Sequence, residues 1–389
     1  MTHSGEHKAF GIYVHWPWCA SKCPYCDFNS HVDRQADQDA MAEYLCTELR
    51  HYASRTGARA VHSIFFGGGT PSLMRGDILA RILAEIRDLW PFSNQVEISM
   101  EANPSSVDAA RFADYRAAGV ERLSLGVQAL NNRDLETLGR LHDVDEALEA
   151  IRLAREHFPR VSFDLIYARP GQTCEAWQAE LTQALRLDPD HLSLYQLTFE
   201  PGTPFHALKE AGKIIPLDDD LGADLYDITQ SLCQSAGLPA YEISNHARAG
   251  AACHHNLIYW RMHDYIGVGP GAHGRFDETS GNKNSGRRAT IALSDPKAWA
   301  AKVRAEGNGL ASDEPVTPAD QATEMMLMGL RLTEGVSLAR YQRLAGKPLA
   351  AKTLEDLQES GLVICRDDRL TVTGAGRPVL NSVLRTLLA

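Results

Sequence analysis

Short apolar runs rich in β-branched and aromatic residues recur along the first half of the chain and predict β-strands. Apolar residues dominate within each run, which is typical of parallel strands that are buried on both faces. Six such runs cover residues 10–15, 61–66, 96–100, 122–127, 161–167 and 191–199.

Longer segments between these runs have the apolar spacing of helices. In residues 77–89, DILARILAEIRDL, the apolar side chains fall on one helical face, and Asp77 is the expected N-cap. Residues 145–156 and 176–187 follow the same pattern. Because strand and helix alternate six times, we expect parallel strands with right-handed crossovers, and hence an α/β fold with a partial TIM-type (β/α)6 barrel.

The pattern changes after about residue 240. Gly, His and aromatic residues then predict ordered loop with short strands, followed by a polar hairpin or exposed loop at 277–290. From about residue 313 the chain predicts three helices, a short hairpin and a further helix, which is a winged-helix-like order. The expected divisions are a barrel at 1–240, a mixed loop and strand segment that completes the pocket at 241–310, and a smaller α-rich, winged-helix-like domain at 311–389.

Composition narrows the class of protein. The chain has 389 residues and a net charge of −11, which argues against general nucleic-acid binding. The helices of the winged-helix-like region are acidic and lack a basic stripe, so we expect a structural or lid role there, with DNA binding as the less favoured alternative. No apolar run reaches the roughly 18 residues of a membrane span, and no apolar signal-peptide core is present, so we expect a cytoplasmic protein.

Three cysteines, Cys19, Cys23 and Cys26, lie within eight residues, whereas the other five are scattered. Close thiols in a reducing compartment indicate a metal site more than a disulfide. A zinc ion with His31 or His15 as fourth ligand is one option, although structural zinc sites usually use two separated ligand pairs. Three thiolates on one loop can instead hold three irons of a [4Fe–4S] cluster and leave the fourth iron open, which we favour.

Polar or glycine-rich positions follow each of the six predicted strands. In an α/β barrel the carboxyl ends of the strands carry the chemistry, so we expect these positions to converge on one site. They are Cys19, the GGGTP segment at 67–71, Glu101, Gln128, Asp164 and Glu200.

The spacing C-x3-C-x2-C after the first strand, together with FFGGGTPS at the second, resembles the radical S-adenosylmethionine (SAM) superfamily. The resemblance implies that the open iron binds the amino and carboxylate groups of SAM and that the reduced cluster can cleave SAM to a deoxyadenosyl radical. It also implies that Gly68, Gly69 and Thr70 contact the methionine part of SAM. The glycines do not form a Walker loop, because no Gly-Lys-Ser/Thr follows them.

Further motifs narrow the resemblance to the oxygen-independent coproporphyrinogen oxidase group. YVHWPWCASKCPYCDF, SMEANP, RLSLGVQAL, LGRLHD, SFDLIYARPGQT and LSLYQLTFEPGT stand in that group's order, and the resemblance covers roughly residues 10–380. It implies that Glu101 binds the ribose hydroxyls, and that some members hold a second SAM in the same pocket. The other implied pocket residues are Tyr13, Tyr25, Gln128, Arg140 and Asp164.

That group has two subgroups, the true oxidases, which decarboxylate coproporphyrinogen, and the haem chaperones. This chain differs from the decarboxylases at two places. They carry a fourth cysteine where this chain has Phe28, and they carry an extension before the first strand, which here starts by residue 10. Both departures resemble the haem-chaperone subgroup, as does the HNLIYW segment at 255–260. The resemblance implies haem binding there, with His255 as our preferred axial ligand and His254 or Cys253 as alternatives.

Tyr259 and Trp260 of the same segment are expected to pack on the porphyrin. Two more positions carry expectations. His273, in GVGPGAHG, is expected to face the pocket, and Arg169 is expected either to meet an anionic group such as a propionate or to lie exposed.

The expected function is therefore a haem chaperone that holds a [4Fe–4S] cluster with SAM, binds haem and delivers it to haem-accepting proteins such as respiratory enzymes. The alternative is a radical SAM enzyme acting on a porphyrinogen, and a structural zinc protein is the third option. No catalytic residue is assigned, and we expect no coproporphyrinogen oxidase activity. The resemblance leaves a homodimer and transient membrane contact open.

Overall fold

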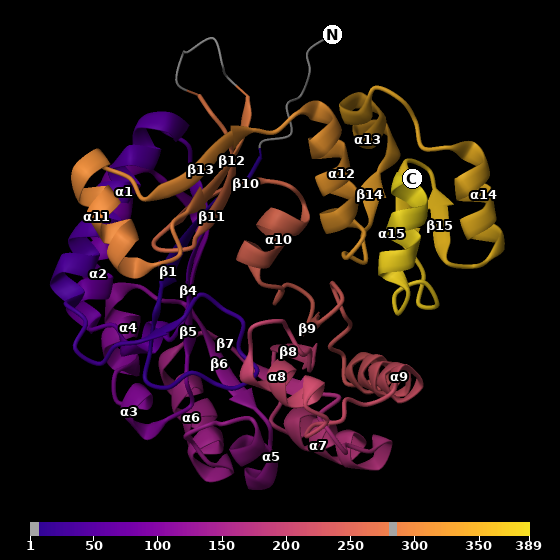
Figure 1. Cartoon of the computed structure of the whole chain (residues 1–389), viewed down its shortest axis with the longest axis horizontal. Coiled ribbons are helices and arrows are strands. Elements are labelled where there is room, and N and C mark those ends of the chain that lie inside the picture. Colours follow the sequence, from indigo (N-terminus) through magenta and orange to yellow (C-terminus); the bar gives the residue numbers. More distant parts are fainter. Residues whose placement is uncertain (1–7, 280–285) are drawn as a thin grey trace.

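The computed structural model describes residues 8–279 and 286–389 (Figure 1). All six strands expected from the apolar runs are present, and each pairs in parallel with the next one along the chain. They are β1 (Phe10–Trp16), β4 (Val61–Gly68), β5 (Phe92–Ala102), β6 (Arg122–Gln128), β7 (Arg160–Tyr167) and β8 (His191–Gln196).

Helices follow the strands along the chain, and most of them cover the outer face of this sheet (Figure 1). They are α1 (Gln38–Thr56), α2 (Gly76–Leu89), α3 (Ser106–Ala109), α4 (Phe112–Ala118), α5 (Asn132–Thr137), α6 (Val144–His157), α7 (Cys174–Arg186), α8 (Pro204–Glu210) and α9 (Asp219–Ser235), with the short 3-10 helix η1 (Pro71–Leu73). The expectation that Asp77 caps α2 is wrong: Arg75 is the N-cap residue, and Asp77 lies in the first turn, where it pairs with Arg75. No helix in the described part of the chain is long and apolar enough to cross a membrane.

The two faces of the strands differ in polarity. Outward residues such as Ile64 and Leu123 belong to the hydrophobic core beneath the helices. Inward residues such as Ser63, Arg122 and Ser162 are polar and buried. The expectation of strands that are apolar on both faces is therefore wrong, because side chains alternate along a strand and the inner face of this barrel carries hydrogen-bonding groups in place of a core.

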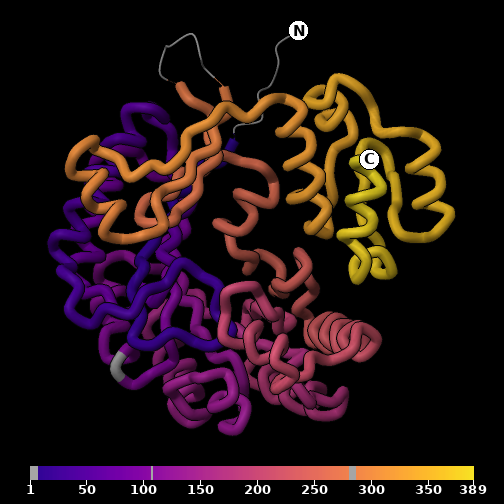
Figure 2. Tube along the Cα trace, in the orientation of Figure 1, coloured from indigo at the N-terminus to yellow at the C-terminus, as the bar shows by residue number. Residues whose placement is uncertain are grey.

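The sheet continues on both sides of the six strands, and in the described residues it contains eleven. The chain returns after residue 260 to place a seventh parallel strand beside β1 (Figure 2), where the sequence predicted only loop and short strands. The remaining elements of this part are β9 (Asn245–Ala247), β10 (Asp264–Val268), β11 (His273–Asp277), β12 (Arg287–Ala292), β13 (Leu310–Pro315) and α11 (Pro296–Glu306), with the separate pair β2 (Trp18–Cys19) and β3 (His31–Val32). The middle of the loop expected at 277–290 lies outside the described residues.

The C-terminal part has its own apolar core, which includes Met326, Val363 and Leu384, and its elements follow the winged-helix-like order. They are α12 (Pro318–Gly329), β14 (Val336–Ser337), α13 (Leu338–Ala345), α14 (Ala351–Glu359), β15 (Val363–Arg366), β16 (Arg369–Val372) and α15 (Leu380–Leu388). A short helix, α10 (His254–Trp260), packs against β1, β4 and β10 on one side and α12 on the other (Figure 1). This helix is therefore the junction between the barrel and the C-terminal part.

Candidate functional site

The three clustered cysteines lie on and after β2, at the carboxyl end of the barrel strands. The backbone N–H of Cys26 donates to the carbonyl of Cys23 at 3.1 Å and turns the loop. The Thr70 hydroxyl donates to Cys19 Sγ at 3.4 Å, and Arg140 Nη1 donates to Cys23 Sγ at 3.5 Å. Burial raises the pKa of the Cys19 and Cys26 thiols. A cation and a hydroxyl that donate to sulfur are the surroundings that a thiolate ligand needs.

The two histidines considered as zinc ligands are already engaged. His15 Nε2 donates to the carbonyl of Asn29 at 2.8 Å, and His31 Nε2 lies 3.1 Å from Asn29 Oδ1. In the described ranges, no three His, Cys, Asp or Glu side chains close on a single metal ion. The Nε2 atoms of His15 and His31 are therefore not open to complete a zinc site with the three thiols in this conformation.

The glycine-rich end of β4 packs directly on the cysteine loop. A Cβ on Gly68, whose φ is 113°, would lie 2.5 Å from His15 Cε1, and one on Gly69 would lie 2.8 Å from the carbonyl of Pro17. The N–H of Gly69 donates to Trp16 O at 2.7 Å, and that of Thr70 donates to Trp18 O at 2.8 Å. Glycine is therefore required for this close approach, which brings Gly68, Gly69 and Thr70 beside Cys19.

Two carboxyl groups face the barrel interior below this loop. Glu101 accepts from the N–H of Gly68 at 3.3 Å. Burial, with a contribution from Asp164, raises the pKa of Glu101 to about 8, and burial raises the pKa of Asp164 to about 6. A nearby cation favours the charged form of a carboxyl, and carboxyl oxygens also accept hydrogen bonds from hydroxyl groups, so the pair suits a cationic ligand that carries hydroxyl groups.

Arg140 connects the cysteine loop to the pocket. Its Nη2 donates to Asn103 Oδ1 at 2.7 Å and to the carbonyl of Gly126 at 2.9 Å, while Nη1 reaches Cys23. Gln128 has a positive φ of 71°, and its Oε1 is buried without a hydrogen-bond partner. Backbone strain clusters at functional sites, and a buried acceptor without a partner needs an explanation, so Gln128 is a candidate ligand contact.

The two predicted tyrosines come from different segments: Tyr13 lies in β1, and Tyr25 lies within the cysteine loop. Tyr13 OH donates to His15 Nδ1 at 2.9 Å, and its ring stacks on Phe65 with centroids 6.4 Å apart. Tyr25 packs against Phe205 at 6.3 Å. Burial raises the pKa of both phenols, so each acts as a neutral donor. These side chains therefore lie toward one end of the barrel, and their roles in holding a cluster and SAM stay predictions.

The HNLIYW segment lies elsewhere: it forms α10 at the amino end of the same strands. Glu97 Oε1 accepts the backbone N–H groups of His254 at 3.0 Å and His255 at 3.4 Å. His255 is 1% exposed, its Nδ1 lies 2.7 Å from Ser63 Oγ, and its ring stacks on Phe65 at 5.2 Å. Burial lowers the pKa of His255 to about 4, so the ring is neutral, and its Nε2 is buried without a partner.

The other haem candidates differ in exposure. Cys253 is fully buried, its thiol donates to Glu97 at 3.6 Å, and burial raises its pKa to about 11. His254, Tyr259 and Trp260 are partly exposed. Among the three candidate axial ligands, His254 is therefore the one that solvent reaches in this conformation.

The expectation for Arg169 is wrong, whereas that for His273 stays a prediction. His273 is exposed at the start of β11. Arg169 is neither exposed nor open to a ligand: it is 3% exposed and pairs with Glu180 and, at 2.9 Å, with Asp134. A buried cation needs such partners, and carboxylates distant in the sequence supply them.

Sequence reasoning missed the polar interior that lies between the two ends of the barrel. Arg160 pairs with Glu97, and Arg122 donates to Ser162 Oγ at 2.7 Å and to His191 Nδ1 at 3.4 Å. The segment RLSLGVQ indicates this polar face, because polar or small residues alternate there with Leu and Val, and alternate residues of a strand share one face. The residues are Arg122, Ser124, Gly126 and Gln128.

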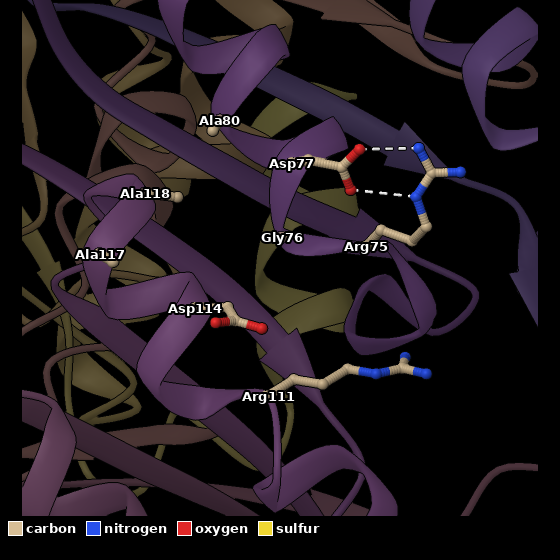
Figure 3. Close-up of a pocket in the computed structure, with 8 residues that line it drawn as sticks. All are labelled: Arg75, Gly76, Asp77, Ala80, Arg111, Asp114, Ala117 and Ala118. Atoms are coloured by element: carbon tan, nitrogen blue, oxygen red, sulfur yellow. Dashed lines mark hydrogen bonds and ion pairs between the residues drawn. The ribbon is translucent and has the colours of Figure 1, made fainter.

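A separate hollow of about 600 Å³ lies outside the barrel between α2 and α4 (Figure 3). Its lining contains no thiol or imidazole, and Arg75 Nη2 pairs with Asp77 at 2.7 Å. This hollow therefore has no part in the candidate site.

Comparison with known proteins finds a family match for each of two parts of the chain. A model of the radical SAM superfamily matches residues 13–182, and a model of the HemN C-terminal domain matches residues 316–379. The solved structure of coproporphyrinogen III oxidase (HemN) from Escherichia coli superposes with a TM-score of 0.81 at 24% identity, over 98% of this chain and 90% of that one. At this identity the likeness shows the fold alone.

Two relatives match nearly end to end. The heme chaperone HemW of Escherichia coli (strain K12) is 37% identical over 383 residues, which cover 97% of this chain and 98% of that protein. The Bos taurus protein named radical S-adenosyl methionine domain-containing protein 1, mitochondrial, is 37% identical over 392 residues, which cover 99% of this chain and 88% of that protein.

Proposed function

Since the chain belongs to the radical SAM superfamily and, within it, to the family of the heme chaperone HemW, we propose that it binds haem and delivers it to haem proteins such as respiratory enzymes. The observation that carries the proposal is the near end-to-end match to that relative at 37% identity. The residue at position 28 also supports the proposal, because the decarboxylases that the chain resembles have a cysteine there. In this chain the position is held by Phe28, whose side chain is 60% exposed.

The residues at the carboxyl end of the barrel fit the cofactors that the family implies. Cys19, Cys23 and Cys26 would hold a [4Fe–4S] cluster, which supplies a one-electron reductant and an open iron when bound. The glycine edge and the carboxyl groups of Glu101 and Asp164 would hold SAM, whose sulfonium and ammonium groups are cationic. The other proposed SAM residues are Tyr13, Tyr25, Thr70, Gln128 and Arg140.

This chain's own residues would do the binding and the orientation. Arg140 would fix the cysteine loop by donating to Cys23 Sγ, and Gln128 would offer its unpartnered acceptor to the ligand. Since the pKa of Glu101 is raised to about 8, binding of a cation would release a proton from it near neutral pH.

For haem we propose the α10 segment, with His255 as the axial ligand and Tyr259 and Trp260 as porphyrin contacts. The supporting observation is that His255 is a neutral imidazole with an unpartnered Nε2, which is the state that a metal ligand needs. Because His255 is 1% exposed, haem would reach it only if α10 shifts, so His254 and Cys253 are tested beside it.

We also propose the three-part division at 240 and 310, and a cytoplasmic location, which would keep the cluster thiols reduced. Haem-accepting proteins would be the partners. Sedimentation of the protein alone would test self-association, and sedimentation with lipid vesicles would test membrane contact during delivery.

The deciding experiment measures two activities on one anaerobically reconstituted sample. We expect a protein-bound haem spectrum on titration with haem and no conversion of coproporphyrinogen. Turnover of coproporphyrinogen with formation of deoxyadenosine would replace the proposal with the decarboxylase alternative. Cys19→Ala should abolish bound iron and acid-labile sulfide, whereas Cys46→Ala, a buried thiol on α1, should leave both unchanged.

The ligand assignment has its own test. His255→Ala should weaken haem binding at least about tenfold and shift the Soret band, while His157→Ala on α6 should change neither. If only His254→Ala or Cys253→Ala has this effect, the axial ligand is that residue and the assignment to His255 is wrong.

A further inference from the structure

A continuous run of hydrogen bonds leads away from the acidic pocket into the barrel. Ser124 Oγ donates to Asp164 Oδ1 at 3.4 Å. The hydroxyls of Ser124 and Ser162 lie 2.8 Å apart, and Arg122 Nη2 donates to Ser162 Oγ at 2.7 Å. Arg122 is 3% exposed, so this side of the run is closed to bulk water.

The same guanidinium continues the run toward α10. Arg122 Nη2 also donates to His191 Nδ1 at 3.4 Å, and His191 Nε2 lies 3.0 Å from Tyr241 OH. Asn256 Nδ2 donates to that phenol oxygen at 3.2 Å, and Tyr259 OH donates to Asn256 Oδ1 at 3.1 Å. The Asn and Tyr of the HNLIYW segment are therefore held by the end of a run that starts in the pocket.

Arg122 can only donate, and this fixes the direction of the bonds to its neighbours on both sides. His191 Nδ1 must accept, so the proton of this ring is on Nε2 and is donated to Tyr241. Burial lowers the pKa of His191 well below its ordinary value, so the ring stays neutral. On the other side Ser162 accepts from Arg122 and donates to Ser124, and Ser124 donates to Asp164. Every donor on that side points at the pocket carboxyl.

Tyr241 is also attached to the C-terminal part of the chain. Its carbonyl accepts from the N–H of Thr333 at 3.0 Å. A displacement of the Tyr241 phenol would therefore be felt by α10 through Asn256, while the backbone of the same residue is bonded to the segment after α12 through Thr333.

We propose that Arg122, His191 and Tyr241 are positioning residues that couple the pocket beside the cluster to α10, so that SAM in the pocket changes the position of α10 and its affinity for haem. The haem part of this proposal rests on the proposed function, whereas the coupling to α10 does not. The physical basis is that an ionised Asp164 facing a cation accepts hydrogen bonds about twice as strong as those of a neutral carboxyl. The rigid donors behind it transmit that change.

The first measurement needs no haem. Anaerobically reconstituted wild type is compared with and without SAM by amide hydrogen exchange, and the peptide that covers residues 253–262 is followed. We expect SAM to slow exchange there in wild type and to leave it unchanged in Tyr241→Phe, which loses only the phenol oxygen. Tyr52→Phe is the matched control, because it removes a buried hydroxyl whose partner is Thr290, outside the run; it should behave as wild type.

The second measurement is the haem Kd with and without SAM. We expect the two values to differ about fivefold or more in wild type and in Tyr52→Phe, which is the usual lower size of a coupling between sites. In Tyr241→Phe the ratio should fall to one while the Kd for SAM itself stays within about twofold, which a merely structural defect would not give. His191→Phe interrupts the run one step earlier and serves if Tyr241→Phe does not fold.

The outcomes separate the two proposals. If wild type binds haem but SAM changes neither exchange in α10 nor the haem Kd, the coupling is wrong and the proposed function stands. If SAM slows exchange in wild type and not in Tyr241→Phe, but haem does not bind, the coupling stands and the proposed function is wrong. An unchanged SAM effect in both Tyr241→Phe and His191→Phe would overturn the coupling.

Discussion

Glu101 and Asp164 place two carboxyl groups on one wall of the barrel, where burial raises the pKa of each. A raised carboxyl pKa means that the folded state holds its proton more tightly than the unfolded state does. Such a group stabilises the fold at low pH relative to high pH, and this contribution is lost as the pH rises from the unfolded value of about 4.3 through the folded value of about 8.

Glu101→Gln should therefore raise the thermal stability of the protein without cofactors, and by more at pH 9 than at pH 6, because the variant has no charge to bury at high pH. The same substitution should weaken SAM binding at both pH values. Differential scanning calorimetry and SAM titration at the two pH values measure this. A variant whose Tm gain is equal at both would show that Glu101 is not the titrating group.

Gly69 tests the close packing between β4 and the cysteine loop. Gly69→Ala places a methyl group 2.8 Å from the Pro17 carbonyl, so the loop must shift, and we expect lower iron and sulfide content after reconstitution with a lower Tm. Gly374→Ala is the control, since a Cβ there meets nothing within 4 Å. Full cluster content in Gly69→Ala would contradict the packing argument.

The sequence could predict a site residue only where its pattern lies within a short segment of the chain. Cys19, Cys23 and Cys26 share one loop and a fixed spacing, so they could be found without a structure. Arg169 could not be placed, because its partner Glu180 is set by the packing of α7 against the strand that precedes it. The glycine-rich turn before His273 does not reveal on which side that residue lies, so its orientation stays a prediction.

Among the elements, α10 is a short helix whose position depends on contacts from other parts of the chain. It has seven residues, which is too short to be stable alone, so its position depends on what holds its first turn. Glu97 does so from β5 by accepting two backbone N–H groups. Burial raises the pKa of Glu97, but the positive charges of Arg122 and Arg160 lower it by more, so the pKa of Glu97 stays below its ordinary value.

Glu97→Gln should destabilise the protein by about 3 kcal/mol at pH 7, the usual cost of removing one partner of a buried ion pair. Because the folded pKa is lowered, the wild-type advantage is present above the unfolded pKa of about 4.3 and should fade as the pH drops below it. Urea unfolding at pH 7 and pH 4 measures the difference. The exposed pair of Glu149 with Arg152 supplies the control, and Glu149→Gln should cost far less stability than Glu97→Gln because solvent screens an exposed ion pair. Equal losses in the two variants would refute the role given to Glu97.

The six strands and their helices could be predicted because apolar runs and helical spacing are local properties. The parallel pairing of β10 with β1 could not, since it joins residues 264–268 to residues 10–14. The placement of α10 at the amino end of the strands depends on the same return of the chain. The pattern could therefore identify the HNLIYW segment but not show that it lies opposite the cysteine loop.

At the scale of the whole molecule, α10 joins the barrel to the C-terminal part. The guanidinium of Arg331 lies 4.8 Å from the centre of the Trp260 ring, and its Nε lies 4.0 Å from Glu242. Arg261 pairs with Glu334 at 2.7 Å across the same junction. One short helix thus contacts both parts, so a loss of contact on either side should loosen it.

Arg331→Met keeps an apolar stem over Trp260 but removes the charge, and with it a cation–π contact worth about 1 kcal/mol. We expect amide exchange in the peptide covering residues 253–262 to become about fivefold faster, while exchange in β5 and β6 stays unchanged because the barrel does not depend on this contact. Arg385→Met, which removes an exposed arginine of α15 that bonds only Ser382 in the described structure, should leave α10 unchanged. Since α10 is also the proposed haem segment, Arg331→Met should alter haem affinity while iron and sulfide content stay at the wild-type level. Loss of cluster in this variant would instead mean that the C-terminal part supports the whole barrel.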